Sequence, residues 1–300
     1  MATRQVGGRV SIADLLPAWD TRERCVRWCE ESGLFPSGVV CHRCLGHCIW
    51  VEDGNLDGWI WRCRRKGCQR RRSPRIGTIF ECSKLRLSTA LQIIYWWSRG
   101  LTVQQAVTVV GTSKVTVVEW FYRCRDICAN YLLEHHRPIG GIGHVVELDE
   151  TKIGHRKYNR GRLRDGVWVV GGLDRGTNDV FLQIVEDRSS DTLVPIIQAM
   201  VKPGTTIMTD EWRAYTAFND RGFQHLTVNH SIHFVHPETG ANTQRMESVW
   251  AQAKQKIKQS KGIRHEFLHL YLVEFLWRRK FGGDCAFTTF IDRIVSVFGD

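Results

Sequence analysis

Two runs of strand-forming residues end in aspartates, and a later segment of helical period carries a glutamate. Asp149 closes VVELD, Asp210 closes TIMTD, and Glu247 lies within TQRMESVW. The apolar residues around Glu247 recur at intervals of three or four, as in a helix docked by one face, and they are Met246, Val249, Trp250, Ala253 and Ile257. The sequence therefore predicts two strands and one helix that each present a carboxylate.

Carboxylates that meet from distant parts of a chain can hold divalent cations. Magnesium prefers oxygen ligands in near-octahedral geometry. Two such ions about 3.5 to 4 Å apart can activate an attacking oxygen and stabilise a leaving oxygen on one phosphodiester. Because most of the 31 acidic residues are expected at the surface, the prediction of a magnesium site at Asp149, Asp210 and Glu247 depends on their strand and helix context.

Composition and charge favour a folded chain with a polyanionic partner. The 300 residues, 43% of them hydrophobic, suffice for two or three domains. The formal charge of +11 is typical of proteins that bind nucleic acid. An acidic membrane surface would suit the same charge, but the apolar stretches are interrupted before the roughly 18 residues that a membrane span needs.

The cysteines indicate metal binding and not disulfides. The N-terminus MATRQVGGRVSIADLL has no apolar stretch of signal-peptide length, so secretion is not expected. The 11 cysteines are an odd number and are concentrated in the first half of the chain. In residues 1–38, a predicted helical region, Cys25 and Cys29 are expected to be core residues and not ligands.

Residues 39–80 contain two cysteine pairs with the spacing of metal ligands. Cys41 and Cys44 form CxxC, and Cys63 and Cys68 form CxxxxC. Four thiolates from two tight turns make a tetrahedral zinc site, which adds folding energy to so small a module. We predict a zinc ribbon with these four ligands. Possible substitute ligands are His42, His47 and Cys48.

A basic run overlaps the second cysteine pair. From Arg62 to Arg75 the chain has eight basic residues and no acid, so we expect no local neutralisation and contact with phosphate. A solvated face is the alternative, and in a eukaryotic cell the run could also be a nuclear address. The residues assigned to DNA contact are Arg64, Arg65, Lys66, Arg70, Arg71 and Arg72.

Residues 84–136 follow a helical pattern in three segments. Gly111 stands where a tight turn would join the second and third segments, and Thr112 or Ser113 can cap the third. This order predicts a helix-turn-helix domain whose last helix enters the major groove with Ser113, Lys114 and Thr116. A three-helix packing unit without DNA contact is the alternative.

The pattern changes to strands after the glycines of RPIGGIG, so a further domain is expected at residues 141–281. Three meandering strands, a helix, a fourth strand, a helix, a fifth strand and a long helix predict a mixed sheet covered by helices, the α/β order of an RNase H-like fold. Asp149 would lie on the central strand and Asp210 on its parallel neighbour. Residues 282–300 are expected to form a final amphipathic helix.

Several other residues of this domain are candidates for accessory roles. Glu150 should point to the opposite face of a regular strand from Asp149. Asp174, at a strand end before a turn, is expected to be a solvated turn carboxylate. His230 either orients a phosphate or water or makes a structural hydrogen bond. Trp212 either stacks on an unpaired base or packs in the core.

The segments VELDET, MTDEWRAY, VNHSIHFV, TQRMESVW and YLVEFLWR resemble the ISXO2-like, or Merlin, group of DDE transposases over nearly the whole chain. The resemblance implies a zinc ribbon ahead of the catalytic domain. It also makes Asp149, Asp210 and Glu247 a catalytic triad that binds Mg²⁺ or Mn²⁺. Two departures, Asn242 where His is expected and Gln244 where Asn is commoner, concern substrate contacts and remove no carboxylate.

The implied reaction is hydrolysis of a DNA strand at the end of a mobile element by metal-activated water, followed by attack of the freed 3′-hydroxyl on target DNA. The ribbon and the helix-turn-helix would bind terminal inverted repeats. A basic loop and a lysine-bearing helix would clamp the DNA, and the residues concerned are Lys152, Arg156, Lys157, Arg160, Arg162 and Lys254. Lys256 and Lys258 would extend this surface, unless the lysines only form a solvated helix edge.

Joining two ends of an element implies a homodimer or a higher homo-oligomer. We expect the protein in the nucleus if the cell is eukaryotic, and in the cytoplasm or nucleoid if it is bacterial. Two alternatives stay open. One is a transposase-derived DNA-binding protein that lacks catalysis, and the other is an RNase H-type nuclease that acts on RNA–DNA hybrids.

Overall fold

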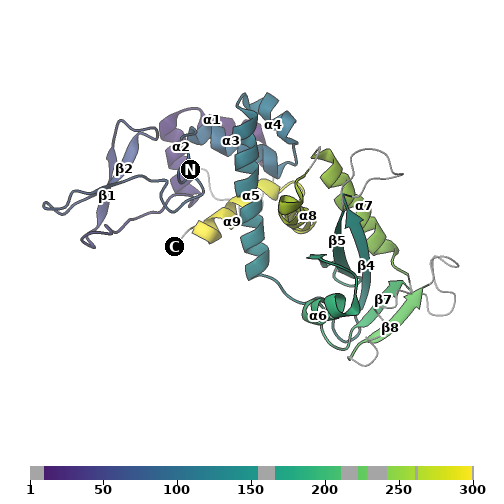
Figure 1. The fold of residues 1–300 in the computed structure, drawn as a ribbon. Helices are drawn as coiled ribbons and strands as arrows, with labels where there is room; N and C mark the ends of the chain where they lie inside the picture. Colours follow the sequence, from purple (N-terminus) through teal and green to yellow (C-terminus); the bar gives the residue numbers. More distant parts are fainter. Residues whose placement is uncertain (1–9, 155–165, 211–221, 229–241, 261–262, 299–300) are drawn as a thin grey trace. The chain divides into compact units, whose positions relative to one another are not determined.

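The computed structural model describes residues 10–154, 166–210, 222–228, 242–260 and 263–298 (Figure 1). The chain forms two compact units. The first consists of Met1–Glu134 together with Trp277–Asp300, and the second is His135–Leu276. Within the described ranges, no helix has both the length and the apolar character that crossing a membrane requires.

The first unit starts with two short helices and a small antiparallel sheet. The helices are α1 (Ile12–Trp19) and α2 (Arg22–Glu31), and the strands are β1 (Cys48–Glu52), β2 (Trp59–Cys63) and β3 (Arg71–Arg72). Ser11 caps α1 and Thr21 caps α2, each by accepting a hydrogen bond from a backbone N–H of the first turn. Cys41 and Cys44 precede β1, whereas Cys63 ends β2 and Cys68 lies between β2 and β3.

Four further helices complete the first unit: α3 (Leu87–Ser98), α4 (Val103–Val110), α5 (Lys114–Glu134) and α9 (Ala286–Phe298). Gly111 ends α4 with a φ of 70°, a left-handed conformation that glycine adopts without strain. The Ser113 hydroxyl accepts a hydrogen bond from the Thr116 N–H at 3.1 Å at the start of α5. The predicted turn at Gly111 is therefore confirmed, and of the two predicted caps, Thr112 and Ser113, the structure has Ser113.

The predicted C-terminal helix is also present, as α9. Its buried face includes Phe287 and Phe290. The ring of Phe290 lies 4.5 Å from that of Trp97 in α3, measured between centroids. The chain end therefore packs into the core of the helical part of the first unit.

The second unit is built on a five-stranded mixed sheet. Its strands are β4 (Val145–Ile153), β5 (Val167–Asp174), β6 (Val180–Val185), β7 (Thr206–Asp210) and β8 (Gln224–Val228), in the order β6-β5-β4-β7-β8. The pairs β4–β5 and β5–β6 are antiparallel, whereas β4–β7 and β7–β8 are parallel. The strand of Asp149 is thus central and the strand of Asp210 is its parallel neighbour, as the sequence predicts.

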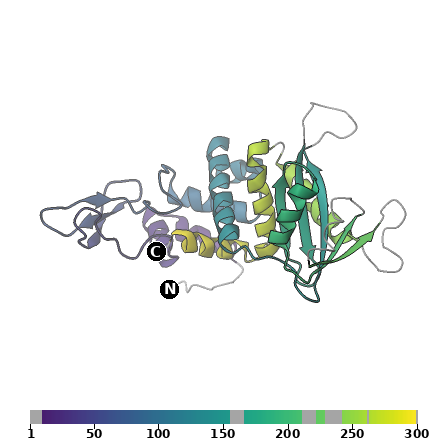
Figure 2. The same ribbon diagram turned by 60° about the horizontal axis from the view of Figure 1, so that its bottom comes forward.

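Helices cover both faces of this sheet (Figures 1 and 2). On one face α6 (Ser190–Met200) packs over a core that includes Leu148, Val170 and Ile197. On the other face α7 (Gln244–Gln259) and the first part of α8 (Leu268–Phe281) pack over a core that includes Val169 and Trp250. The expected class is confirmed: an α/β chain with an RNase H-like mixed sheet, preceded by a cysteine-rich module and a three-helix segment.

Candidate active site and metal centre

The sheet register brings two of the predicted carboxylates to neighbouring positions. In the parallel pair of β4 and β7, Glu147 lies opposite Met208. Asp149 and Asp210 each stand two residues further along their strands, so they lie side by side on the same face of the sheet. On its other side Asp149 pairs with Gly171 of β5.

The third carboxylate is carried over this face by α7. Glu247 is in the first turn of α7 and is exposed, while Met246 and Trp250 beside it are buried against the sheet. Gly171 permits this approach, because a Cβ atom there would lie 2.9 Å from the Trp250 ring and closer still to Met246. Helix α7 therefore lies close over β5 at the register position of Asp149.

The charges of the two other predicted carboxylates act on the pKa of Asp149. The pKa of Asp149 is raised to about 7. Burial is the largest cause, and the negative charges of Asp210 and Glu247 contribute to the same shift. A divalent cation would remove the repulsion and stabilise the ionised forms. An anionic oxygen cluster of this kind suits the hard cations Mg²⁺ and Mn²⁺.

The carboxylates are less tightly gathered than the cysteines described below. Among the described residues, only the cysteine group places three or more ligand atoms within 4.8 Å of one another. A site with two ions does not require this closeness, because the ligands are divided between ions about 3.5 to 4 Å apart.

Glu150 lies on the opposite face, as strand alternation predicts. Burial, followed by the charges of Asp210 and Asp149, raises the pKa of Glu150 to about 8, and Arg188 opposes this shift. One of its carboxyl oxygens is buried and has no hydrogen-bond partner within the described part of the chain. Glu150 thus lies next to Asp149 in the chain without facing α7.

A groove joins two of the three carboxylates, Asp149 and Glu247, to two lysines. Its volume is about 720 Å³, and it is lined by Asp149, Thr151, Glu247, Trp250, Ala251, Lys254, Gln255 and Lys258. Lys254 and Lys258 follow Glu247 by seven and eleven positions, which returns them to the same face of α7. The Lys254 ammonium donates to the Thr151 hydroxyl. The groove therefore places two carboxylates and two ammonium groups along one wall.

The structure changes the expected roles of two other lysines. Lys256 lies 3.5 Å from the buried carboxylate of Glu274 in α8, so it pairs within the unit and does not extend the groove surface. Lys152 lies on the face opposite Asp149, directly beside Trp168 in the sheet, with its ammonium 5.6 Å from that ring. Alternation along β4 could have excluded Lys152 from the carboxylate face, because it is three residues from Asp149.

Asp174 is not the solvated turn carboxylate that its position suggested, because it is only 1% exposed. Its carboxylate accepts hydrogen bonds from the N–H groups of Gly140 at 3.2 Å and Gly176 at 2.8 Å, and lies 2.8 Å from Nδ1 of His144. Although burial opposes it, these bonds lower the pKa of Asp174. Backbone N–H groups thus take the place of water as hydrogen-bond donors to the buried Asp174 carboxylate.

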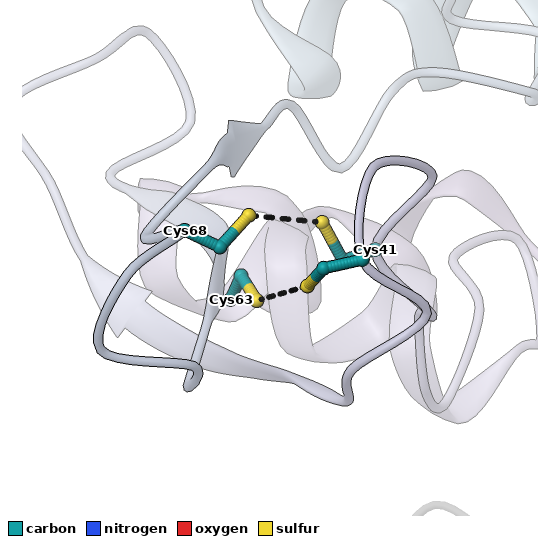
Figure 3. Close-up of side chains that lie close together, drawn as sticks. Cys41, Cys63 and Cys68 are labelled. Carbon is teal, nitrogen blue, oxygen red and sulfur yellow. Dashed lines mark hydrogen bonds between the residues drawn. The ribbon is translucent and has the colours of Figure 1, made fainter.

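The four predicted zinc ligands converge in the first unit. All four sulfur atoms, of Cys41, Cys44, Cys63 and Cys68, lie within 4.8 Å of one another. The sulfurs of Cys41 and Cys68 are 3.6 Å apart, and those of Cys44 and Cys63 are 3.4 Å apart. Figure 3 shows the side chains of Cys41, Cys63 and Cys68 directed toward one another. Ligands about 2.3 Å from a tetrahedral zinc ion would be about 3.8 Å apart, so the cluster has nearly the required size.

The chemistry of these thiols also fits a cation. The N–H groups of Arg43 and Cys44 donate to the Cys41 sulfur and lower its pKa to about 6. Although the N–H of Arg65 donates to Cys63, burial and the neighbouring sulfurs raise the pKa of Cys63 to about 12. A cation between the sulfurs would favour the thiolate form of Cys63 as well as that of Cys41. The alternative ligands His42 and His47 are exposed, and they are not part of the cluster.

The basic run is partly neutralised, contrary to expectation. Arg75 is buried and pairs with buried Asp57, with Nε 2.7 Å from a carboxylate oxygen. Arg71 pairs with Asp53. Both acids come from the connection between β1 and β2, outside the run. The residues of the predicted DNA contact that are exposed are Arg64, Arg65, Lys66, Arg70 and Arg71, whereas Arg72 is half-buried.

The remaining predicted contacts have mixed outcomes. Ser113 and Lys114 are exposed at the start of α5, and Thr116 is half-buried with its hydroxyl 2.8 Å from that of Ser113. The side chains of Ser113 and Thr116, two of the three predicted contacts, therefore already form hydrogen bonds at the start of α5. Other predicted residues lie outside the described part of the chain, namely Arg156, Lys157, Arg160, Arg162, Trp212 and His230.

Comparison with known proteins places the chain among transposases. The ISXO2-like transposase domain matches residues 141–280. An uncharacterized transposase-like protein of Haemophilus influenzae is 35% identical over 99 residues, which cover 33% of this chain and 79% of that protein. Male abnormal protein mab-31 of Caenorhabditis elegans is 23% identical over 295 residues, covering 87% of this chain and 65% of its own length. The chain thus spans less than two thirds of that relative.

Two solved assemblies have weak structural similarity to the chain. A simian T-cell lymphotropic virus intasome in complex with PP2A regulatory subunit B56 gamma gives a TM-score of 0.32 at 13% identity, over 62% of this chain and 64% of the other. A pre-cleavage Mos1 transpososome gives 0.29 at 12% identity, over 70% and 78%. These values are too low to carry an argument, and the assignment depends on the family match and the Haemophilus relative. On that evidence, the chain belongs to the ISXO2-like transposase family.

Proposed function

We propose that the protein is a metal-dependent DNA transposase that hydrolyses a strand at an element's end and joins the freed 3′-hydroxyl to target DNA. The observation that carries this proposal is the electrostatic coupling of Asp149 to Asp210 and Glu247 beside a lysine-lined groove. Bound Mg²⁺ or Mn²⁺ would supply activation of the attacking oxygen and stabilisation of the leaving oxygen. Asp149, Asp210 and Glu247 would hold these ions.

The other groove residues act on the phosphodiester backbone. Lys254 and Lys258 attract phosphate, and the bond from Lys254 to Thr151 directs the ammonium across the groove toward β4. The buried Trp250 forms an apolar part of the groove wall. We assign no covalent role to any side chain, because in-line displacement needs only positioned oxygens and charge stabilisation.

The first unit would recognise the DNA ends. We propose that Cys41, Cys44, Cys63 and Cys68 bind zinc, which orders the ribbon, and that the exposed basic residues beside it bind phosphate. Residues 84–136 would add contacts in the major groove through the start of α5. Joining two ends in one reaction requires at least a homodimer. The reaction would take place in the nucleus of a eukaryote or in the cytoplasm or nucleoid of a bacterium.

One observation favours a second function, a DNA-binding protein without catalysis. The Caenorhabditis elegans relative matches 87% of this chain, and its printed name is not that of a transposase. This alternative predicts tight binding to the same DNA and no metal-dependent strand cleavage. It differs from the transposase proposal only in the second unit, so a substitution in the carboxylate site separates the two.

The test compares wild type, Asp210→Ala and Asp191→Ala on a labelled duplex carrying the inverted repeats that flank the coding sequence. Asp191 is an exposed aspartate in α6, on the opposite face of the same unit, and controls for loss of a carboxylate. We expect Asp210→Ala to lose at least about a hundredfold in cleavage rate, since a metal's charge stabilisation is worth several kcal/mol. Asp191→Ala should cleave normally.

The outcomes divide the three functions. Equal behaviour of wild type and Asp210→Ala on every substrate, with binding retained, would favour the DNA-binding protein. Preferential cleavage of an RNA–DNA hybrid of the same sequence would favour a nuclease of the RNase H type. Cleavage of the duplex at the repeat end, followed by joining to a second duplex, is the result that the transposase proposal requires.

A further inference from the structure

A second acidic residue of β4 faces α7 but is not part of the proposed metal site. Glu147 is fully buried and lies two residues before Asp149, so both project from the same face of the strand. One carboxylate oxygen of Glu147 accepts a hydrogen bond from the Met246 N–H at 2.9 Å. The other accepts one from Nε of Arg175 at 2.7 Å. Both oxygens of this buried side chain are therefore occupied.

The bond to Met246 replaces a cap that α7 does not supply itself. The first N–H groups of a helix have no partner within the helix. Thr243 precedes α7 and makes no capping side-chain hydrogen bond. Glu147 provides both an acceptor for one of these N–H groups and a negative charge at the positive end of the helix dipole. The strand therefore caps the helix from across the interface.

Arg175, which directly follows the end of β5, forms hydrogen bonds with the residues at the start of α7. Its Nη2 donates to the backbone oxygen of Asn242 at 3.1 Å and to the Asn242 side-chain oxygen at 2.7 Å. Its backbone oxygen accepts a hydrogen bond from Arg245 at 3.0 Å, and its N–H donates to Val145 of β4 at 2.9 Å. Asn242, a departure from the family pattern, thus has a structural partner here.

We propose that Glu147 and Arg175 are positioning residues that fix Glu247 relative to Asp149. The inference rests on the proposed metal-dependent function. Glu247 directly follows Met246, whose N–H is anchored, and its own N–H donates to Thr243 at 2.9 Å. Asp149 stands about 7 Å along the strand from Glu147, at about 3.3 Å per residue. One rigid strand therefore carries a metal ligand and also the anchor for the helix that carries another.

The test is Glu147→Gln, which keeps the side-chain volume and removes the charge and one acceptor. The Gln amide group would then face either the Met246 N–H or Arg175 Nε, donor against donor. Hydrogen exchange of the peptide containing residues 242–250 measures the anchor directly. Mn²⁺ affinity, followed by electron paramagnetic resonance of the free ion, measures its consequence. We expect exchange at least tenfold faster and Mn²⁺ affinity about ten- to hundredfold weaker, as when other supporting residues of metal sites are removed.

Two further variants separate positioning from general stability. Thr205→Val removes another fully buried polar group of the second unit, whose hydroxyl bonds to Gly141 and Lys202 and not to α7. Thr205→Val should leave the Mn²⁺ affinity unchanged even if it lowers the thermal stability as much as Glu147→Gln does. Arg175→Lys keeps a positive charge beside Glu147 without the paired bonds to Asn242, and should give an intermediate loss of affinity even if Glu147→Gln fails to fold.

Each result has a definite meaning. Unchanged exchange at residues 242–250 in Glu147→Gln, or faster exchange with unchanged Mn²⁺ affinity, overturns the proposal. Equal loss of affinity in Thr205→Val overturns it as well, because it would indicate a general loss of stability. A wild-type protein that binds Mn²⁺ with this dependence on Glu147, but cleaves no DNA, would refute the transposase function and leave the positioning role standing. A wild type that binds no Mn²⁺ overturns both.

Discussion

Replacing Asp149 with Asn should stabilise the metal-free protein at alkaline pH. The folded state raises the pKa of Asp149 from 3.8 to about 7 through burial and the charges of Asp210 and Glu247. Between these two values the unfolded chain loses the proton and the folded chain keeps it. The contribution of Asp149 to the free energy of unfolding is therefore fully present below pH 3.8. It is lost as the pH rises toward and through 7. Asn cannot ionise, so this loss should disappear in the variant.

The size of the effect follows from the two pKa values. Each pKa unit corresponds to about 1.4 kcal/mol, so the difference between 3.8 and about 7 corresponds to about 4 kcal/mol at pH 8. The Asn oxygen can still accept the hydrogen bond that Asp149 accepts from the Glu150 N–H at 2.8 Å. At pH 4 the two proteins should have nearly equal free energies of unfolding, because Asp149 is then largely protonated when folded.

The assay is urea unfolding of the full chain without added Mg²⁺ at pH 4 and pH 8, with hydrogen exchange of β4 and β5 reporting on the second unit. Asp174→Asn is the matched control of opposite sign. Because hydrogen bonds lower the pKa of Asp174 despite its burial, its stabilising contribution is lost only as the pH falls below 3.8, so this substitution should destabilise at pH 8 and nearly as much at pH 4. Mg²⁺ at a hundred times its dissociation constant should stabilise wild type by about 2.7 kcal/mol. If Asp149→Asn unfolds at the same urea concentration as wild type at pH 8, the repulsion argument is wrong.

Two other predictions concern the first unit and its binding to DNA. Cys63→Ser should abolish zinc binding and unfold the ribbon, since structural zinc contributes about 10 to 16 kcal/mol, while exchange protection of β4 stays intact. Atomic absorption should find one zinc per chain in the exposed-thiol control Cys82→Ser, and the same content in Cys63→Ser would contradict the ligand assignment. DNA affinity measured by fluorescence anisotropy should fall about a thousandfold between 50 and 200 mM salt if about six phosphates are contacted. Arg64→Gln should lower the slope of log K against log salt by about 0.9, and a flat dependence would exclude phosphate contact as the main source of affinity.

The strands and the helix that carry the three predicted carboxylates could be predicted because their signals are periodic. The runs ending in Asp149 and Asp210 have strand composition, and the spacing of Met246, Trp250 and Ala253 determines which face of α7 is buried. The parallel pairing of β4 with β7 then places two carboxylates side by side without any further information. The cysteine cluster was predictable for a similar reason, because the two short cysteine spacings leave few ways to arrange the four sulfurs.

The errors have a different origin, since they concern charges whose partners are distant in sequence. Arg75 and Asp57 are 18 residues apart and are buried together. Asp174 is buried by backbone donors at Gly140 and Gly176 that no composition rule identifies. A run of basic residues or a turn carboxylate is expected at the surface on average. Pairing across the fold reverses this expectation, and only coordinates show which charges are paired.

Glu147 shows what such buried pairs contribute beside a reactive site. Alternation along β4 puts it on the face of Asp149, so sequence alone could suggest a fourth metal ligand. Its oxygens are instead used by Arg175 and the start of α7, while the oxygens of Asp149 face a groove and are repelled by their neighbours. Strand β4 thus carries Glu147, whose charge is balanced by hydrogen-bond donors, and Asp149, whose charge is repelled by neighbouring carboxylates. The satisfied group can hold a helix in place, and the unsatisfied group is the one with free energy to gain from a cation.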